Sequence, residues 1–188
     1  TLAGPVNATL GAITLHTYTI LDNDNAPTLA ISDVTQAEGN SGTTDFTFTV
    51  TKTGATEFTA GVNFATANGT TLPATGNVSC GSGFDYAAQV GTLSFLPADI
   101  SKTITVQVCG DVVYEGHETF FVNLSSPTSA TISDSQGLGT ISNDDAAPTL
   151  AISDVTQVEG NSGTSGFVFT VTKTGSTEIT TTVDFATA

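Results

Sequence analysis

Hydrophobic and polar residues alternate with a period of two through the middle of the chain. Phe46, Phe48 and Val50 are separated by single threonines, and the same alternation recurs over 103–108. Such alternation is typical of strands with one buried face. On this basis we predict strands over 28–33, 44–52, 57–67, 91–96, 101–109, 118–125 and 129–142. We expect a bulge around 133–137 in the last strand, and a loop over 68–90, where Gly, Asn and Ser are frequent.

These short strands predict an all-β fold. Seven of them within about 120 residues favour an antiparallel β-sandwich of immunoglobulin-like type. The composition agrees, because the 188 residues include 37 Thr, which favours strands, and 19 Gly, which favours turns. A helical bundle is therefore excluded, and the Phe and Val content is sufficient for a hydrophobic core.

The chain repeats itself at a fixed offset. Residues 26–67 and 147–188 are identical at 33 of 42 positions, with a constant offset of 121 and no gap. We therefore predict tandem domains: 1–25 are the C-terminal strands of a preceding repeat, 26–146 form one complete domain, and 147–188 are the N-terminal strands of a following repeat. Neither end piece holds enough strands to close two sheets, so we expect exposed strand edges there unless neighbouring chain covers them.

Charge is strongly unbalanced towards acid. The chain has 3 Lys, no Arg and 18 Asp plus Glu, for a net charge of −15. This excludes nucleic acid and anionic membrane surfaces as partners, because both require clustered cations. No apolar run approaches the roughly 18 residues of a membrane span. Because the chain contains no Met, we expect it to be a processed product or an excerpt.

The predicted strand directions gather carboxylates at one end of the sandwich. Consecutive strands alternate in direction, so the first, third and fifth connections and the exit from the last strand share one end. That end carries seven carboxylates, which we call the acidic pole: Glu38, Asp85, Asp111, Glu115, Glu118, Asp144 and Asp145. Ca²⁺ is the cation that fits best, since it takes six to eight oxygen ligands with flexible geometry. The alternative is a solvated acidic cap without metal, and His117 is expected to be a solvated imidazole rather than a ligand.

Two cysteines, Cys80 and Cys109, do not form a CxxC motif. A single pair in an acidic, Thr-rich chain favours one disulfide and an oxidising compartment. Cys80 belongs to the predicted 68–90 loop and Cys109 ends a strand at the same end of the sandwich, so a bridge is feasible. The alternative is a pair of free buried thiols.

Three stretches resemble the Calx-beta domain, a module first recognised in sodium–calcium exchangers. They are VTQAEGNSGTTDFTFTV, GFDYAAQVGTLSFLPADISKTITVQV and DVVYEGHETFFVNLSSPTSATI, of which the D-x-x-x-E-G-x-E-T-F pattern at 111–120 is the most specific. The resemblance implies a β-sandwich with calcium ligands at Glu38, Asp85, Asp111, Glu115, Glu118 and the run that ends in Asp144 and Asp145. Gly110, His117 and Asn143 depart from the family, which often has Asp at these positions. The resemblance therefore implies fewer ions or weaker affinity.

The junctions between repeats are short and acidic. Asp22 and Asp24 close the preceding repeat as Asp144 and Asp145 close the complete one, and a proline follows in both cases. The stretch DNDNAP at 22–27 is also similar to the calcium linker between cadherin domains, although the rest of that pattern is absent. Glu159 occupies the position of Glu38 in the following repeat. We therefore count Asp22, Asp24 and Glu159 among the candidate metal ligands and expect each calcium pole at a domain junction.

The sequence predicts a calcium-binding structural module of a repetitive extracellular adhesin, fibre or matrix protein. Calcium would stiffen the junctions, the partners would be neighbouring repeats or other copies in a fibre, and the location would be extracellular or on the cell surface. No P-loop, GxGxxG, HExxH or GxSxG motif occurs, so we expect no enzyme. The alternative is an adhesion module that binds carbohydrate or protein through the 68–90 loop.

Overall fold

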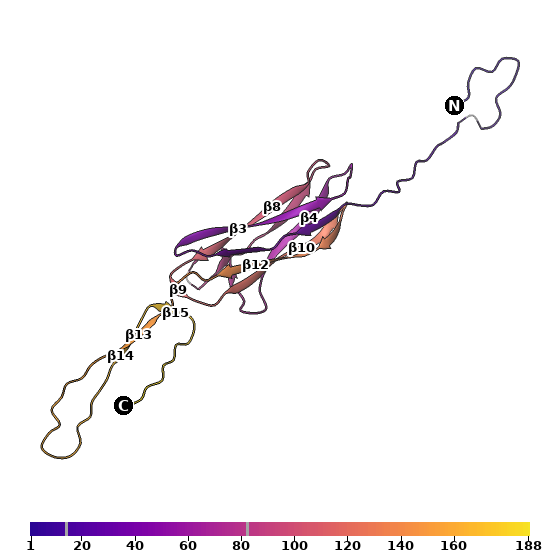
Figure 1. Ribbon diagram of the computed structural model, residues 1–188. Coiled ribbons are helices and arrows are strands. Elements are labelled where there is room, and N and C mark those ends of the chain that lie inside the picture. Colours follow the sequence, from indigo (N-terminus) through magenta and orange to yellow (C-terminus); the bar gives the residue numbers. More distant parts are fainter. Residues whose placement is uncertain (14, 82) are drawn as a thin grey trace.

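The chain folds as a β-sandwich with an extended segment at each end (Figure 1). The computed structural model describes residues 1–13, 15–81 and 83–188, and none of these residues lies in a helix. One sheet has the order β11-β1-β3-β8-β6-β5 and the other the order β2-β12-β10-β4-β7. The all-β sandwich predicted from the alternation is therefore confirmed.

The strands agree closely with the expected ranges. The first sheet contains β11 (Thr131–Asp134), β1 (Thr28–Ile31), β3 (Gly42–Thr53), β8 (Ser101–Gly110), β6 (Tyr86–Ala87) and β5 (Gly76–Asn77). The second contains β2 (Val34–Ala37), β12 (Gln136–Ser142), β10 (Glu118–Thr128), β4 (Ala60–Asn68) and β7 (Val90–Phe95).

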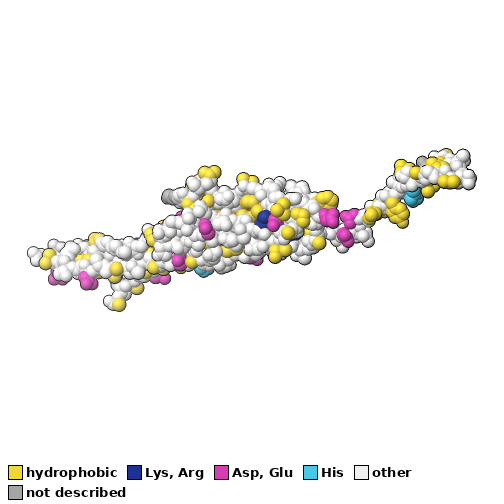
Figure 2. All heavy atoms as spheres, turned by 90° about the horizontal axis from the view of Figure 1, so that it is seen from above, with side chains coloured by type: hydrophobic (Ala, Val, Ile, Leu, Met, Phe, Trp, Pro, Cys, Tyr) yellow, Lys and Arg dark blue, Asp and Glu magenta, His cyan; other side chains and the backbone are white. Residues whose placement is uncertain are grey.

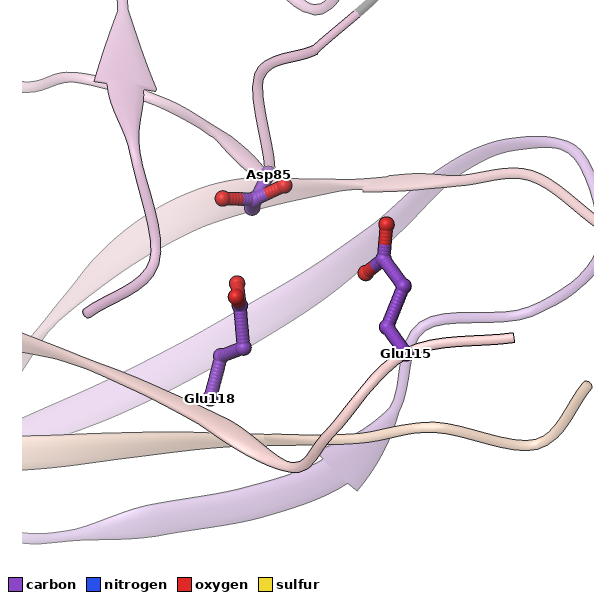
Figure 3. A group of neighbouring side chains, drawn as sticks. All are labelled: Asp85, Glu115 and Glu118. Carbon is purple, nitrogen blue, oxygen red and sulfur yellow. The ribbon is translucent and has the colours of Figure 1, made fainter. Parts of the chain in front are cut away.

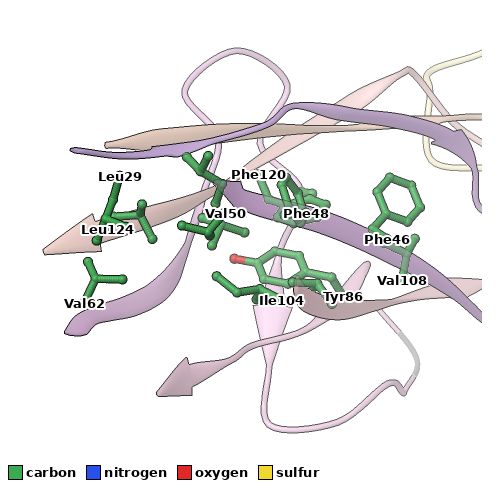
Figure 4. Packing of buried hydrophobic residues seen from close by; sticks show 14 of the residues in the cluster. Leu29, Phe46, Phe48, Val50, Val62, Tyr86, Ile104, Val108, Phe120 and Leu124 are labelled. Carbon is green, nitrogen blue, oxygen red and sulfur yellow. The ribbon is translucent and has the colours of Figure 1, made fainter. Parts of the chain in front are cut away.

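The core lies between the two sheets and is centred on Phe120 of β10. Its ring stacks on Tyr86, with centroids 4.7 Å apart, and meets Phe46 and Phe48 at 5.8 Å each. All four rings are almost completely buried (Figure 4). The inward residues of β3 are the apolar members of its alternating pattern and, at its end, Lys52, as expected for a strand with one buried face.

The first and last strands of the sandwich each cross from one sheet to the other. The predicted strand over 28–33 is split into β1 and β2, which pair in parallel with β11 and β12. The crossing is fastened by Asp33, whose Oδ1 accepts the Leu138 N–H at 2.7 Å. The expected interruption of the last strand lies at Ser135, between β11 and β12. The two sheets are thus antiparallel except where these edge strands meet and where β5 pairs with β6 in parallel.

The segment 68–90, which the composition predicts as a loop, contributes to the sheet and to the core. It contains β5 and β6, and Tyr86 and Ala74 are buried. The Asn68 side chain holds the segment together, since its Oδ1 accepts both the Tyr86 hydroxyl at 2.7 Å and the Gly76 N–H at 3.1 Å. Strands of two residues carry no readable alternation, so the sequence pattern missed them.

The two end segments leave the sandwich at opposite ends (Figure 1). Among the described residues of 1–27 there is no strand, and their large apolar side chains are mostly exposed. In the C-terminal segment, β13 (Thr149–Ile152) pairs with β14 (Val171–Thr174), and β15 (Ser176–Thr177) pairs with β9 (Val113–Tyr114) of the central domain.

The C-terminal hairpin has no second sheet over it within the described chain. The apolar residues of β13 and β14 are all exposed, in contrast to their counterparts in β1 and β3. The uncovered strands expected at the C-terminal end are therefore present. The strands expected over 1–25 are not, since the described residues of that segment form none. No helix among the described residues is long and apolar enough to cross a membrane.

Candidate metal centre

Three carboxylates of the acidic pole lie close enough to share one ion. Asp85 precedes β6, Glu115 follows β9, and Glu118 is the first residue of β10. One oxygen from each lies within 4.8 Å of the others. Figure 3 shows the three side chains pointing towards a common space from separate parts of the chain. Two oxygens on opposite sides of a Ca²⁺ are about 4.8 Å apart, so this spacing suits that ion.

The other four members of the acidic pole lie beside this group. Glu38 lies in the field of Glu115, Asp111, Asp144 and Asp145. The exit from β12 is tied to the turn after β2, because Asp144 Oδ1 accepts the Gly39 N–H at 3.2 Å. All seven carboxylates that the strand directions place at one end are therefore neighbours in the folded domain.

Crowding of negative charge raises the pKa values of the central carboxylates. Burial, followed by the charges of Glu115 and Asp111, raises the pKa of Glu38 to about 8. Burial and the charge of Asp85 raise the pKa of Glu118 to about 8. Burial, followed by the charge of Glu178, raises the pKa of Glu115 to about 7. Burial and Asp144 also raise the pKa of Asp145. Without a cation, these groups hold protons that exposed carboxylates would release.

Several of these oxygens lack a hydrogen-bond donor. Glu118 Oε2 and Asp145 Oδ2 are buried and have no hydrogen-bond partner in the part of the chain that the structure describes. The Glu38 side chain is only 4% exposed, and none of the hydrogen bonds between described residues ends on its carboxylate. Buried carboxylates normally find a donor or a cation, because losing water uncompensated is costly. The donor set therefore fits a hard cation bound by oxygen.

His117 and Asn143 brace the acidic pole. The Asn143 N–H donates to His117 Nδ1 at 3.1 Å, and Asn143 Oδ1 accepts the Glu115 N–H at 3.0 Å. These bonds join the segment before β10 to the exit from β12 and fix the backbone of Glu115. Two residues that depart from the resembling family thus position a carboxylate.

Gly110, the third departure, leaves no room for a side chain. A Cβ at this position would lie 2.2 Å from the Gly39 carbonyl oxygen and 2.9 Å from that of Glu38. The close approach of β8 to the turn after β2 therefore requires glycine here. It also holds the Glu38 backbone against the end of β8.

The three remaining candidates lie away from the acidic pole. Asp22 and Asp24 line a groove at the opposite end of the sandwich, together with Glu57 and Phe58. Glu159 lies in the C-terminal segment and is exposed. Its backbone carbonyl accepts the Ser165 hydroxyl, as that of Glu38 accepts the Thr44 hydroxyl. That these three residues belong to the junctions of other repeats stays a prediction.

Glu178 adds an eighth carboxylate that the sequence analysis missed. It follows β15, and its N–H donates to the Tyr114 carbonyl at 3.3 Å, one residue before Glu115. Its charge acts on both Glu115 and Glu118. The rule of alternating strand directions identifies Glu178 when it is applied across the junction. Glu178 lies in the second connection of the following repeat, and that connection faces the acidic pole of the complete domain.

Cys80 and Cys109 form a disulfide, and no free cysteine remains among the described residues. The bridge joins the 68–90 segment to the end of β8, next to Asp85, whose backbone carbonyl accepts the Cys109 N–H at 2.8 Å. The predicted pairing is present in the structure, and it fastens the segment that supplies Asp85 to the acidic pole.

Removal of this disulfide should destabilise the domain. The bridge spans a sequence separation of 29 residues, and closing a loop of that size contributes roughly 3–4 kcal/mol in the chain-entropy model. We expect the Cys80→Ala/Cys109→Ala double variant to unfold at lower denaturant concentration than the parent chain. Adding a reducing agent should shift the parent chain in the same way and leave the variant unchanged. Equal midpoints for parent and variant would contradict this prediction.

The chain is similar to proteins that carry Calx-beta domains. Sodium/calcium exchanger 1 from Canis lupus familiaris and from Bos taurus is 30% identical over 132 residues, which cover 70% of this chain. The matched region spans only 13% of the length of each exchanger.

Solved structures show the same fold. The apo-form Calx CBD1 domain is 22% identical, with a TM-score of 0.53, and the match covers 64% of this chain and 100% of that domain. The calcium binding domain CBD12 of CALX1.1 is 23% identical, with a TM-score of 0.51, and the match covers 67% and 50% of the two chains.

A family model matches well over half of the chain, from residue 22 to residue 154, and includes all of both sheets together with the acidic pole. The family it describes is the one that the 111–120 pattern resembles. This chain therefore belongs to the Calx-beta domain family.

Proposed function

We propose that the acidic pole binds Ca²⁺ and that the bound ions hold successive repeats in a fixed arrangement. Ca²⁺ is the cofactor indicated by the carboxylate geometry, and the related CBD12 of CALX1.1 is a calcium binding domain. The observation that carries the proposal is Glu118, whose buried Oε2 has no hydrogen-bond partner among the described residues and whose carboxylate shares one space with those of Asp85 and Glu115. A bound cation would compensate the charge of such a group and supply the partner that its oxygen lacks.

The available ligands suit Ca²⁺ better than Mg²⁺. The acidic pole offers seven carboxylates from separate segments, and bidentate carboxylates readily fill a shell of six to eight oxygens. Mg²⁺ needs a stricter octahedron and keeps several waters, so it gains less from so many side chains. Two of the three lysines lie at the far end of the domain, where Lys52 donates to the Leu96 and Pro97 carbonyls and Lys102 pairs with Asp99. The third, Lys173, lies in β14 of the C-terminal segment.

We further propose a structural role in a repetitive extracellular or cell-surface adhesin, fibre or matrix protein, with no enzymatic activity. The internal repeat, the disulfide and the uncovered strands of the C-terminal segment support this role. The partners would be neighbouring repeats and, in a fibre, other copies. Ions at a junction would stiffen it, because they attract groups that otherwise repel each other.

A ligand-binding role for the 68–90 segment receives less support. Of its two aromatic residues, Tyr86 is buried and stacks on Phe120. Phe84 is half-buried beside Asp85. Neither ring is displayed as the exposed stacking platform that carbohydrate recognition uses.

Calorimetric titration tests calcium binding directly. We expect the chain, after treatment with a chelator, to bind Ca²⁺ and to release protons on binding, because Glu38 and Glu118 hold protons in the metal-free state. Glu118→Gln keeps the shape of the side chain but removes one ligand charge, so it should weaken binding by roughly ten-fold.

The matched control is Asp99→Asn, which removes a carboxylate from the opposite end of the domain, where Asp99 pairs with Lys102 at 2.9 Å. This variant should bind Ca²⁺ as the parent chain does. A parent chain that gives no heat of binding at millimolar Ca²⁺ would refute the proposed function.

A further inference from the structure

We propose that Glu178, carried by the segment that follows the sandwich, is a Ca²⁺ ligand of the acidic pole, so that a single site is built from two successive repeats. The inference rests on the calcium function proposed above and assigns to it a residue from outside the complete domain. It makes calcium a direct link across the junction rather than a stabiliser of one domain alone.

The backbone register brings Glu178 to the site. β15 pairs in parallel with β9, with Ser176 opposite Val113 and Thr177 opposite Tyr114. The pairing is reinforced by the Thr177 hydroxyl, which donates to the Tyr114 carbonyl at 2.6 Å. The residue that follows each strand is a glutamate: Glu178 follows β15 and Glu115 follows β9. Adjacent positions of paired strands lie about 5 Å apart, which is within reach of one ion.

The charges agree with this placement. Glu178 is the first neighbour, after burial, to raise the pKa of Glu115, and it also acts on Glu118. The carboxylates of Asp85, Glu115 and Glu118 face one another. Their repulsion of Glu178 would push the C-terminal segment away from the domain. Yet the structure keeps β15 hydrogen-bonded at this position. A cation between the carboxylates turns this repulsion into attraction.

Buried oxygens without hydrogen-bond donors indicate a binding position for a cation within the acidic pole. Glu118 Oε2 and Asp145 Oδ2 are buried and have no hydrogen-bond partner among the described residues. These groups are independent of Glu178, since they belong to the complete domain. They identify the place where an ion would lie, and the register of β15 identifies the side from which Glu178 approaches it.

The internal repeat provides a second example of the same arrangement. Glu57 is the counterpart of Glu178, and the turn around each is closed alike: the Phe58 N–H donates to Thr56 Oγ1 at 3.1 Å, and the Ile179 N–H donates to Thr177 Oγ1 at 2.9 Å. Glu57 lines one groove with Asp22 and Asp24, the acidic run that precedes the domain. Figure 2 shows acidic side chains gathered where the N-terminal segment meets the sandwich. At both junctions, this glutamate lies next to carboxylates of the repeat before it: Glu178 next to Glu115, and Glu57 in the groove of Asp22 and Asp24.

Glu178→Gln tests the inference in the full chain. The side chain is exposed, so the variant should fold as the parent does. We expect its affinity for Ca²⁺, measured by calorimetry, to be about ten-fold weaker. Hydrogen exchange gives a second readout: Ca²⁺ should slow exchange of the residue 178 amide in the parent chain, and this slowing should be lost in the variant.

The control is Asp99→Asn, which makes the same kind of change from carboxylate to amide at the opposite end of the domain, where Asp99 pairs with Lys102. It should leave both the affinity at the acidic pole and the protection of the residue 178 amide unchanged. Thr177→Val provides a second control, because it removes the hydroxyl bond to Tyr114 but keeps the carboxylate. We expect it to loosen β15 with or without calcium.

The outcomes separate the inference from the proposed function. If Glu178→Gln binds Ca²⁺ like the parent chain while Glu115→Gln binds it weakly, the cross-junction ligand is refuted and the calcium site remains. If the parent chain binds no Ca²⁺, both fail. Weaker binding in Glu178→Gln but not in Asp99→Asn supports the inference.

Discussion

Calcium should raise the midpoint of thermal unfolding of this chain strongly. Binding to the folded state alone adds about 4.1 kcal/mol per ion when free Ca²⁺ is a thousand-fold above its dissociation constant. The effect is large because the metal-free domain holds seven neighbouring carboxylates, of which Glu38 is buried and four others are half-buried. Melting scans with Ca²⁺ and with a chelator at the same pH measure the difference.

Two variants locate the source of this stabilisation. Glu115→Ala removes one of the three carboxylates within 4.8 Å of each other and should abolish most of the calcium-dependent shift. Asp99→Ala, at the opposite end, should reduce stability slightly through its ion pair with Lys102 but keep the shift. An identical midpoint with and without calcium would show that the acidic pole is merely a solvated cap.

The same scans should depend on pH in a defined direction. Folding raises the pKa of Glu38 and Glu118 from 4.5 to about 8, so between these values the folded state holds more protons than the unfolded state. The stability that these groups contribute without metal is therefore complete below about pH 4.5 and is lost as the pH rises through about 8. Calcium competes with those protons, so its stabilising effect should grow from pH 5 to pH 8.

Replacement of Phe120 by Ala should be the most damaging single change in the core. The ring is fully buried and contacts three aromatic rings from β3 and β6. Its removal leaves a cavity between the two sheets, and Phe→Ala changes in such sites cost about 3–5 kcal/mol. Chemical denaturation monitored by circular dichroism measures the loss in the free energy of unfolding.

Phe58→Ala is the matched control for this prediction. Phe58 is 68% exposed, in the turn before β4, and its truncation should change stability by no more than about 0.5 kcal/mol. Phe120→Leu should lie between the two, because it keeps part of the buried volume. If Phe120→Ala unfolds at the same denaturant concentration as Phe58→Ala, the two sheets do not depend on this contact.

Alternation along the chain was sufficient to predict the long strands. A strand with one buried face places every second residue inward, so β3 and β8 are readable from sequence alone. Because successive long strands alternate in direction, the end at which each connection lies follows as well. The sequence is therefore sufficient to assign seven carboxylates from separate segments to one end of the sandwich.

Other features depend on contacts between distant segments and left no local pattern. The crossing of the first strand depends on Asp33 meeting Leu138, 105 residues away. The strands β5 and β6 have two residues each and exist because β8 offers an edge to pair with. Glu178 was missed because its role depends on the junction, where β15 meets β9.

The two copies of the first hairpin separate what sequence determines from what tertiary structure decides. In β1–β3 and in β13–β14 the register is the same, with Thr28 opposite Thr53 and Thr149 opposite Thr174. Local hydrogen bonds recur as well, since Ser32 and Ser153 each accept an N–H from the facing strand. The hairpin is therefore encoded locally, by alternation and by turn residues, and forms even where no second sheet covers it.

The environment of the glutamate in this hairpin is not encoded locally. Glu38 is 4% exposed with a pKa of about 8, whereas Glu159, in a nearly identical sequence, is exposed to solvent. Around Glu38, the segment before β10 and the exit from β12 cover the turn after β2 and place their carboxylates next to it. Glu159 has no such neighbours among the described residues. The sequence by itself determined the strands, the register and the acidic residues available. Closure of the sandwich decided which of them form a site, because burial and mutual repulsion arise only when distant segments meet.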